Sequence, residues 1–304
     1  MTTLVLDTST ERGILAAFNL KTVVQDGKVM QDFEFKEENC LFEEQLPFGL
    51  QSSHFVLPIL QKKIEEGVFQ QEALTSIIVG IGPGSYTGIR VGATIAKCLA
   101  FALDIPVIGV STLEAFVPNQ EGPYAVVIDA KIGGVYMQKG VLSRGKTHFM
   151  SQPQAYSLDE AVRLLHDVSY IVTPYAEKIA SKLEASNLEM AVQDGKVMQD
   201  FELESLTAGG DHFQKVKAPP TVSVYGSKDS INLPSSTAVS RLMPHQKWEW
   251  QECYPSAYQM LQVGIRKGAT QSCTSTDARL ELLYLRKTQA EIGMVQKGSK
   301  KVTL

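Results

Sequence analysis

Two aspartates, each directly after an apolar run, are the residues of this chain best placed for chemistry. Asp7 follows the apolar run 3–6 and precedes Thr8 and Ser9, whereas Asp129 follows a second apolar run. A carboxylate at such a position can hold Mg²⁺ through water, or it can accept the backbone amides of its own turn. For Asp129 we favour the turn role, and for Asp7 both roles stay open.

A glycine-rich turn is the second candidate for chemistry. It lies between the apolar run 77–81 and a helical pattern that ends near residue 103, and it contains Gly82, Gly84 and Gly88. A P-loop needs a lysine followed by Ser or Thr after its last glycine, whereas Ile and Arg follow Gly88. A dinucleotide-binding turn needs two residues between its second and third glycines, and here there are three. The spacing matches neither motif and favours a tight strand-to-helix turn.

The helical pattern behind this turn carries a stripe of minimal side chains. Gly88, Gly92, Ala96 and Ala100 recur every four residues, so they lie above one another on one helix face. Thr87 is a candidate N-cap for this helix. Such a stripe allows another backbone to approach closely, and two neighbours stay open: a helix of a partner or the chain's own sheet.

These residues need elements to position them, and a strand–Asp–turn–strand pattern occurs twice. Apolar residues at 3–6 and 14–18 flank the first turn, and those at 124–128 and 135–139 flank the second. Two such halves predict an α/β protein with a cleft between them. Other helices are expected at 53–66, 158–166, 177–188 and 254–267, and other strands at 41–46, 106–110 and 171–173.

The composition indicates an ordinary globular protein. The chain has 304 residues, 44% of them hydrophobic and 20% charged, with a net charge of −4. This length suggests two domains, and the acidic balance opposes a nucleic-acid groove across the whole surface. No apolar window is long enough for a membrane span, and the first residues do not read as a signal peptide. The four cysteines form no CxxC pair, which fits reduced thiols in a cytoplasmic protein.

An exact internal repeat interrupts this pattern. Residues 24–34 and 192–202 are identical. Asp-Gly between β-prone residues favours a type I′ turn, so each copy is expected to form a small hairpin. We place no function in either copy, and the segments 20–38 and 190–246 look like insertions.

Five motifs in order resemble the bacterial TsaB (YeaZ) family. They are Asp7-Thr-Ser-Thr, Gly82–Gly92, Ile105–Glu114, Asp129-Ala-Lys and Tyr284-Leu-Arg. The resemblance covers about 3–18, 39–188 and, more weakly, 248–286. It implies the actin-like (ASKHA, ribonuclease H-like) two-domain fold, with an N-terminal subdomain over 1–112 and a C-terminal one over 113–304. The last helix is expected to pack back on the N-terminal subdomain.

The resemblance also implies a function. Family members support the formation of N6-threonylcarbamoyladenosine at position 37 of tRNAs that read adenine-initial codons. They act as the non-catalytic partner of the transferase TsaD, in a system that also uses TsaC and the ATPase TsaE. On this basis the chain forms a heterodimer with TsaD, contacts TsaE and tRNA only through that complex, and can form a homodimer when alone. ATP, Mg²⁺ and a metal ion then belong to the partner proteins, and this subunit holds no cofactor.

The residues of this chain fit the scaffold better than the catalyst. The catalytic paralogue carries an HxxxH metal motif, whereas no two histidines of this chain are four residues apart. An ATP-binding domain of this fold needs glycine soon after the strand-end aspartate, and here Thr8 and Ala130 follow Asp7 and Asp129. We assign no catalytic residue and no metal ligand. The residues that remain candidates for a vestigial nucleotide site are Asp7, Thr8, Ser9, Gly82 and Gly84.

Two enzymatic readings remain as alternatives. The first is an actin-like ATP-binding phosphotransferase or ATPase, and the second is a peptidase, for which the chain offers no nucleophile motif of the G-x-S-x-G type.

In the family, the two helices matching residues 53–66 and 87–103 form the surface that pairs with TsaD. The interface residues that this implies are Leu57, Leu60, Ile64, Gly88, Ile89, Arg90, Gly92, Ile95, Ala96 and Leu99.

Overall fold

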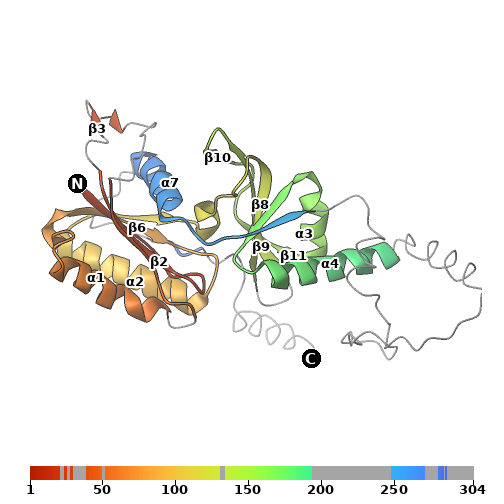
Figure 1. The fold of residues 1–304 in the computed structure, drawn as a ribbon, viewed down its shortest axis with the longest axis horizontal. Coiled ribbons are helices and arrows are strands. Elements are labelled where there is room, and N and C mark those ends of the chain that lie inside the picture. Colours follow the sequence, from red (N-terminus) through yellow and green to blue (C-terminus); the bar gives the residue numbers. More distant parts are fainter. Residues whose placement is uncertain are drawn as a thin grey trace, which may run out of the picture.

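Two mixed β-sheets, each covered by helices, make up the computed structural model (Figure 1). The structure describes residues 1–20, 24–25, 28–29, 39–49, 52–130, 134–193, 248–270, 280–283 and 285. Among the helices in this part of the chain, none is long and apolar enough to cross a membrane.

The N-terminal sheet has five strands in the order β5-β2-β1-β6-β7. β1 pairs antiparallel with β2 and parallel with β6, and β6 continues the parallel pairing to β7. β1 is buried along its whole length and β6 is buried from Ile77 to Gly80, because helices cover both faces of the sheet. The strand bounds are β1 Thr2–Asp7, β2 Ile14–Asn19, β5 Cys40–Gln45, β6 Leu74–Gly80 and β7 Val107–Val110.

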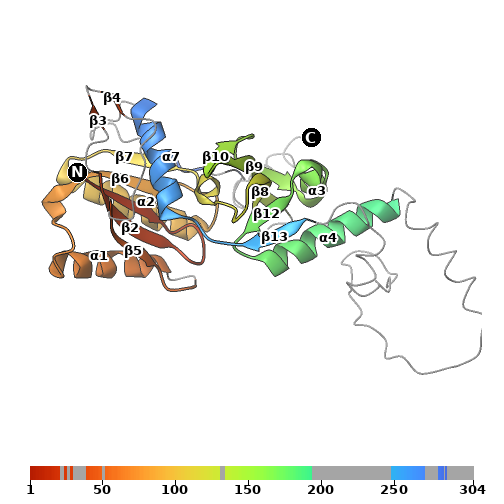
Figure 2. The same ribbon diagram turned by 45° about the horizontal axis from the view of Figure 1, so that its top comes forward.

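Helices α1 (Val56–Glu65) and α2 (Tyr86–Leu103) cover one face of this sheet, and α7 (Ala257–Thr270) covers the other (Figure 2). On the first face, buried residues of both helices share a core with Leu4, Leu6 and Val79. On the second face, Met260 and Leu261 of α7 pack on Val5 and Ile78. The short helices η2 (Ser52–Phe55) and η3 (Gln71–Ala73) lie on either side of α1 in the sequence.

The C-terminal sheet runs β10-β9-β8-β12-β13, with β11 paired to β9. Helices α3 (Leu158–Leu164) and α4 (Ala176–Gln193) share one core with this sheet, and η4 (Thr112–Ala115) contributes to a second core. The remaining elements are β8 Gly122–Asp129, β9 Gly134–Ser143, β10 Lys146–Phe149, β11 Gln154–Ser157, η5 Leu165–Asp167, β12 Tyr170–Thr173 and β13 Glu249–Glu252.

The doubled strand–Asp–turn–strand unit is confirmed. β1 ends at Asp7 and turns back into antiparallel β2, and β8 ends at Asp129 and turns back into antiparallel β9. In each sheet the first strand of this hairpin also has a parallel neighbour on its other side. The predicted α/β class with two related halves is therefore correct.

Two local predictions need correction. The N-cap of α2 is Ser85, whose Oγ accepts a hydrogen bond from the Gly88 amide at 3.3 Å, so Thr87 lies inside the helix. The first repeat copy forms the expected hairpin, with β3 (Val24–Gln25) antiparallel to β4 (Lys28–Val29). The second copy begins as the last residues of α4, because Val192 and Gln193 are helical there. Its remaining residues, and most of both expected insertions, lie outside the described residues.

Candidate functional site

The Asp7 carboxylate is fully buried at the end of β1 and accepts hydrogen bonds from its own surroundings. Its Oδ1 accepts from the Ser9 amide at 2.6 Å and from the Ser9 hydroxyl at 2.5 Å. Its Oδ2 accepts from the Thr112 hydroxyl at 2.7 Å, and Thr112 belongs to η4. Asp7 therefore caps its own turn and ties that turn to the segment that leaves β7.

Burial raises the pKa of Asp7 above its ordinary value of 3.8, although the hydrogen bonds from Ser9 and Thr112 act in the opposite direction. Desolvation dominates because the charged form loses its water on all sides. Gly80 lies against this carboxylate, since a side chain there would overlap it. The network fits the turn-capping role for Asp7, which is the second of the two roles that the sequence left open.

The glycine turn packs on the β1–β2 turn and uses its amides within the chain. The Ser85 amide donates to the Ser9 carbonyl oxygen at 2.7 Å, and a Cβ on Gly84 would overlap the same Ser9 carbonyl. Gly82 adopts a φ of +95°, which only glycine adopts without strain. The Ser85 amide is therefore not available to a phosphate, and the two turns that the sequence singled out hold each other.

The small-residue stripe of α2 faces the chain's own core. A Cβ on Gly88 would overlap the Thr8 carbonyl, and one on Gly92 would overlap the Thr8 hydroxyl. Ala96 and Ala100 are buried in the core beneath the helix. This corrects the expectation that the stripe brings a partner helix close, because β1 and its turn already occupy that position.

The predicted interface residues therefore divide into three groups. Leu57 and Arg90 are exposed on the outside of the helices, and Ile64, Ile95 and Leu99 are partly buried. Those buried within the chain, which do not face outward as an interface requires, are Leu60, Gly88, Ile89, Gly92 and Ala96.

The outer face of α1 and α2 carries large exposed apolar side chains. Phe101 is 87% exposed and Leu57 is 52% exposed, and Phe55 and Tyr86 lie at the starts of the two helical segments with 43% and 44% exposure. The Arg90 guanidinium lies 3.8 Å from the centre of the Tyr86 ring. We call this set, Phe55, Leu57, Tyr86, Arg90 and Phe101, the outer face. Exposed aromatic and Arg side chains are enriched at protein–protein interfaces.

The chain matches a protein-family model described as "TsaD: tRNA N6-adenosine threonylcarbamoyltransferase" over residues 51–218. It belongs to this family, as a TsaB (YeaZ) member. It is 36% identical over 104 residues to the tRNA threonylcarbamoyladenosine biosynthesis protein TsaB of Bacillus subtilis. The aligned residues make up 33% of this chain and 45% of that protein. It is 33% identical over 141 residues to TsaB of Escherichia coli, and these residues make up 45% of this chain and 53% of that protein.

The chain thus spans about half the length of these curated TsaB relatives. The resemblance drawn from the sequence motifs is confirmed. A crystal structure of an uncharacterized protein with similarity to peptidase YEAZ from Pseudomonas aeruginosa aligns with a TM-score of 0.55 and 19% identity. The alignment covers 94% of this chain and 99% of that one, and it supports the predicted actin-like two-domain fold.

In this TsaB-family chain the second strand-end aspartate is held by two lysines of α4. Asp129 is nearly fully buried, and its two carboxylate oxygens accept from Lys178 Nζ and Lys182 Nζ, each at 2.7 Å. Hydrogen bonding to Asp129 raises the pKa of Lys178. Both oxygens are thereby paired with ammonium groups, which supports the structural role favoured for Asp129. Across the described residues, no group of three or more His, Cys, Asp or Glu side chains is arranged to hold a metal ion.

The turn after β1 also touches the C-terminal half. The Arg12 guanidinium lies 4.7 Å from the centre of the Tyr254 ring. Burial raises the pKa of Tyr175 to about 12, and the charge of Glu11 adds to this shift. Residues 11 and 12 of the turn therefore lie against residues that directly precede α4 and shortly precede α7.

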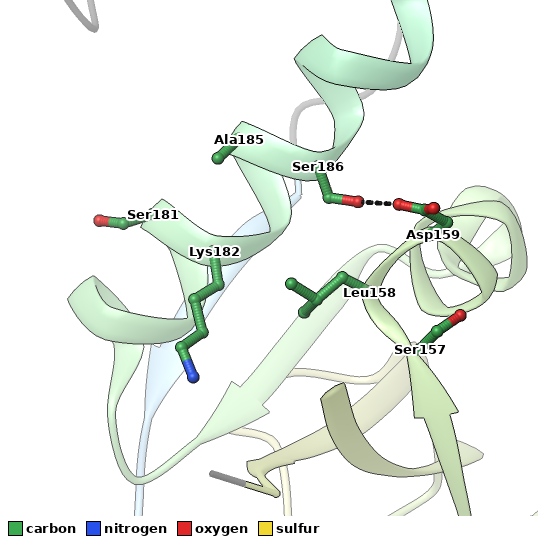
Figure 3. A pocket seen from close by; sticks show the side chains of 7 residues that line it. All are labelled: Ser157, Leu158, Asp159, Ser181, Lys182, Ala185 and Ser186. Atoms are coloured by element: carbon green, nitrogen blue, oxygen red, sulfur yellow. Dashed lines mark hydrogen bonds between the residues drawn. The ribbon is translucent and has the colours of Figure 1, made fainter. Parts of the chain in front are cut away.

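A hollow of about 470 Å³ lies between α3 and α4. Its polar side chains are engaged within the chain. The Ser186 hydroxyl donates to Asp159 at 2.5 Å, as Figure 3 shows, and Lys182 points away from this pair and donates to Asp129. The Ser157 hydroxyl donates to Glu160, and the Ser181 hydroxyl donates to the Glu177 carbonyl oxygen. The hollow is open and shallow between two crossing helices. Its lining residues are Ser157, Leu158, Asp159, Ser181, Lys182, Ala185 and Ser186.

Reasoning from sequence missed several residues that shape these sites. Neither the hydrogen bond from Thr112 to Asp7 nor the partners of Asp129 were foreseen. Lys178 and Lys182 are four residues apart on a helix, so their spacing places both ammonium groups on one face. Phe101 directly follows Ala100 of the stripe, so its side chain points away from the stripe's face of the helix, and this position could have marked it as exposed.

Proposed function

We propose that this chain is the scaffold subunit of a threonylcarbamoyltransferase complex, in which it binds TsaD and supports its activity on tRNA. The observation that carries the proposal is the outer face of α1 and α2, where Phe101 is 87% exposed and Leu57 is 52% exposed. These apolar side chains cost free energy in water, and a partner that covers them removes that cost. The family membership supports the choice of TsaD as this partner.

The proposal places the contact on the outer face and leaves the small-residue stripe to the chain's own core. In this proposal Phe101 and Leu57 are the apolar anchors, and Arg90, which lies over the Tyr86 ring, adds a charged contact. Aromatic anchors and Arg usually carry most of the energy of such interfaces. Ile64, Ile95 and Leu99 are partly buried and contribute from below.

The chain contributes no catalytic group in this proposal. The two strand-end carboxylates, Asp7 and Asp129, are satisfied by neighbouring side chains. In nucleotide-binding actin-like proteins these positions face phosphate and Mg²⁺, so their internal pairing supports the scaffold role over a phosphotransferase or ATPase. ATP, Mg²⁺ and the transfer chemistry are assigned to the partner proteins, and tRNA and TsaE are reached through the complex.

Co-purification with the cognate TsaD, followed by a threonylcarbamoylation assay with and without this chain, tests the proposal. We expect a stable complex and tRNA modification that depends on the chain. A TsaD that modifies tRNA equally well without it contradicts the scaffold role. Tight Mg·ATP binding by the isolated chain supports the phosphotransferase or ATPase alternative instead.

A further inference from the structure

Residues 280–283, which come after α7 in the sequence, lie on the face of the N-terminal sheet opposite α7. Met260 and Leu261 of α7 pack on one face with Val5 and Ile78. Leu280, further along the chain, packs against the core on the other face, the one that α1 and α2 cover. Residues 280–283 thus lie on the sheet face that α1 and α2 cover, and the outer side of these helices is the surface we propose for the partner.

This segment contacts the turn between β6 and α2 through both backbone and side chain. The Leu283 amide donates a hydrogen bond to the Ile81 carbonyl oxygen at 2.9 Å. The Leu280 Cδ1 atom lies only 2.9 Å from the point that a Cβ on Gly109 would occupy, and the Leu283 carbonyl lies 3.4 Å from the corresponding point on Gly82. Two glycines therefore provide the room in which the segment lies.

The contact completes the hydrogen bonding of the residues that lead into α2. The Ile81 amide donates to the Val110 carbonyl at 2.9 Å, and the Gly82 carbonyl accepts from the Thr112 amide at 2.8 Å. The Ile81 carbonyl receives its partner, the Leu283 amide, from the segment. Without the segment, this carbonyl and the apolar surface beneath Leu280 are uncovered, and one restraint on the first turn of α2 is lost.

We propose that residues 280–283 form a strap that fixes the β6–α2 turn, and that partner binding on the outer face depends on this strap being in place. This inference rests on the proposed function for the identity of the partner, TsaD. The strap is a positioning element: Leu280 and Leu283 touch Gly109, Ile81 and Gly82, and they act on the partner through α2.

Shortened chains and single substitutions test the strap. One chain ends after residue 279 and lacks it, and a matched control ends after residue 286 and keeps it. Leu280→Asp places a charge in the apolar contact, and Leu283→Pro removes the amide that Ile81 accepts. Glu281→Ala, at an exposed position within the segment, is the control substitution.

Two readouts separate this inference from the proposed function. By titration calorimetry with TsaD, we expect at least tenfold weaker binding for the chain ending after 279 and for Leu280→Asp, and near-normal binding for both controls. A synthetic peptide of residues 279–287 should restore binding to the shortened chain. Unchanged affinity in these folded variants overturns the strap.

Hydrogen exchange of the free chain is the second readout and needs no partner. We expect faster exchange over residues 81–89 in Leu280→Asp and Leu283→Pro than in the intact chain and in Glu281→Ala. If the intact chain does not bind TsaD, the proposed function fails, and the exchange alone then decides the strap. Equal exchange in all four chains overturns it.

Discussion

The Thr8 hydroxyl donates a hydrogen bond to the Gly88 carbonyl oxygen at 2.7 Å, and it joins the turn after β1 to the first part of α2. The two residues are 80 positions apart in the sequence. Their contact explains why Gly88 and Gly92 lack side chains, because a Cβ at either position would overlap Thr8. The stripe thus serves the internal packing of the N-terminal half, and the opposite side of the same helix is left for a partner.

Gly92→Ala is expected to destabilise the fold. Its new methyl group overlaps the Thr8 hydroxyl, so we expect a loss of about 1–3 kcal/mol in the free energy of unfolding, as for other overpacked positions. Urea unfolding measures this loss. Thr94→Ala is the control on the exposed side of the same helix and should be neutral or slightly stabilising. A Gly92→Ala chain as stable as the parent contradicts the packing described for α2.

The buried carboxyl of Asp7 predicts a pH dependence of stability. Its pKa is raised in the folded chain above the ordinary value of 3.8, so the folded state binds the proton more tightly than the unfolded state does. The free energy of unfolding therefore falls as pH rises from about 3.8 through the folded pKa. Asp7→Asn cannot titrate, so its difference from the parent chain should shrink across this window.

Urea unfolding of both chains at a series of pH values measures that difference. The buried network makes Asp7→Asn less stable at low pH, because an amide nitrogen cannot accept the hydrogen bond from Thr112. Parallel pH profiles for the two chains are the outcome that rules out a titrating Asp7.

The two lysines that hold Asp129 are expected to differ in importance. The side chain of Lys182 is 30% exposed and that of Lys178 is 57% exposed. Lys182→Met removes one of the two ammonium groups that pair with a buried carboxylate and should cost about 1–3 kcal/mol of unfolding free energy. Lys178→Met should cost less, because solvent screens the more exposed pair. Thermal and urea unfolding compare them.

Lys62→Met provides the matched control for this pair of variants. Lys62 forms an exposed ion pair with Glu66 at 3.7 Å, so its removal should change stability by less than about 0.5 kcal/mol. If Lys182→Met is as neutral as Lys62→Met, the stability of the fold does not depend on the Lys182–Asp129 pair.

Cys98 offers a chemical footprint of the outer face. It is exposed on α2, three residues before Phe101. We expect N-ethylmaleimide to modify Cys98 readily in the free chain and at least tenfold more slowly in the TsaD complex. Burial raises the pKa of the Cys253 thiol to about 12, so this residue should stay unreactive in both states. Mass spectrometry of the modified peptides gives both rates, and equal rates at Cys98 place the partner elsewhere.

The doubled hairpin could be predicted because each strand, aspartate and turn is a local pattern. Whether the small-residue stripe faces a partner or the chain's own core could not be predicted, because small residues are needed equally for a partner helix and for the chain's own sheet. Only the position of Thr8 under Gly88 decides between them. The strands β10, β11 and β13 were missed because they are short, with four residues each and few buried side chains.

The repeat shows how local sequence can fail altogether. Val24 and Gln25 form a strand, whereas the identical pair Val192 and Gln193 continues α4. In the second copy the preceding helix extends into the pair, and in the first copy a two-residue connection returns the chain to β4. Tertiary and neighbouring context therefore overrides the β propensity of these residues.

Titration calorimetry of Phe101→Asp against the cognate TsaD is the most direct test of the central claim. Phe101 is 87% exposed, so the substitution should leave the fold intact, and Met150→Asp, at another exposed apolar residue with 69% exposure, is the control. We predict that Phe101→Asp weakens TsaD binding at least tenfold, about 1.4 kcal/mol or more, while Met150→Asp binds like the parent chain. Equal affinity for all three chains would contradict the outer face of α1 and α2 as the partner surface.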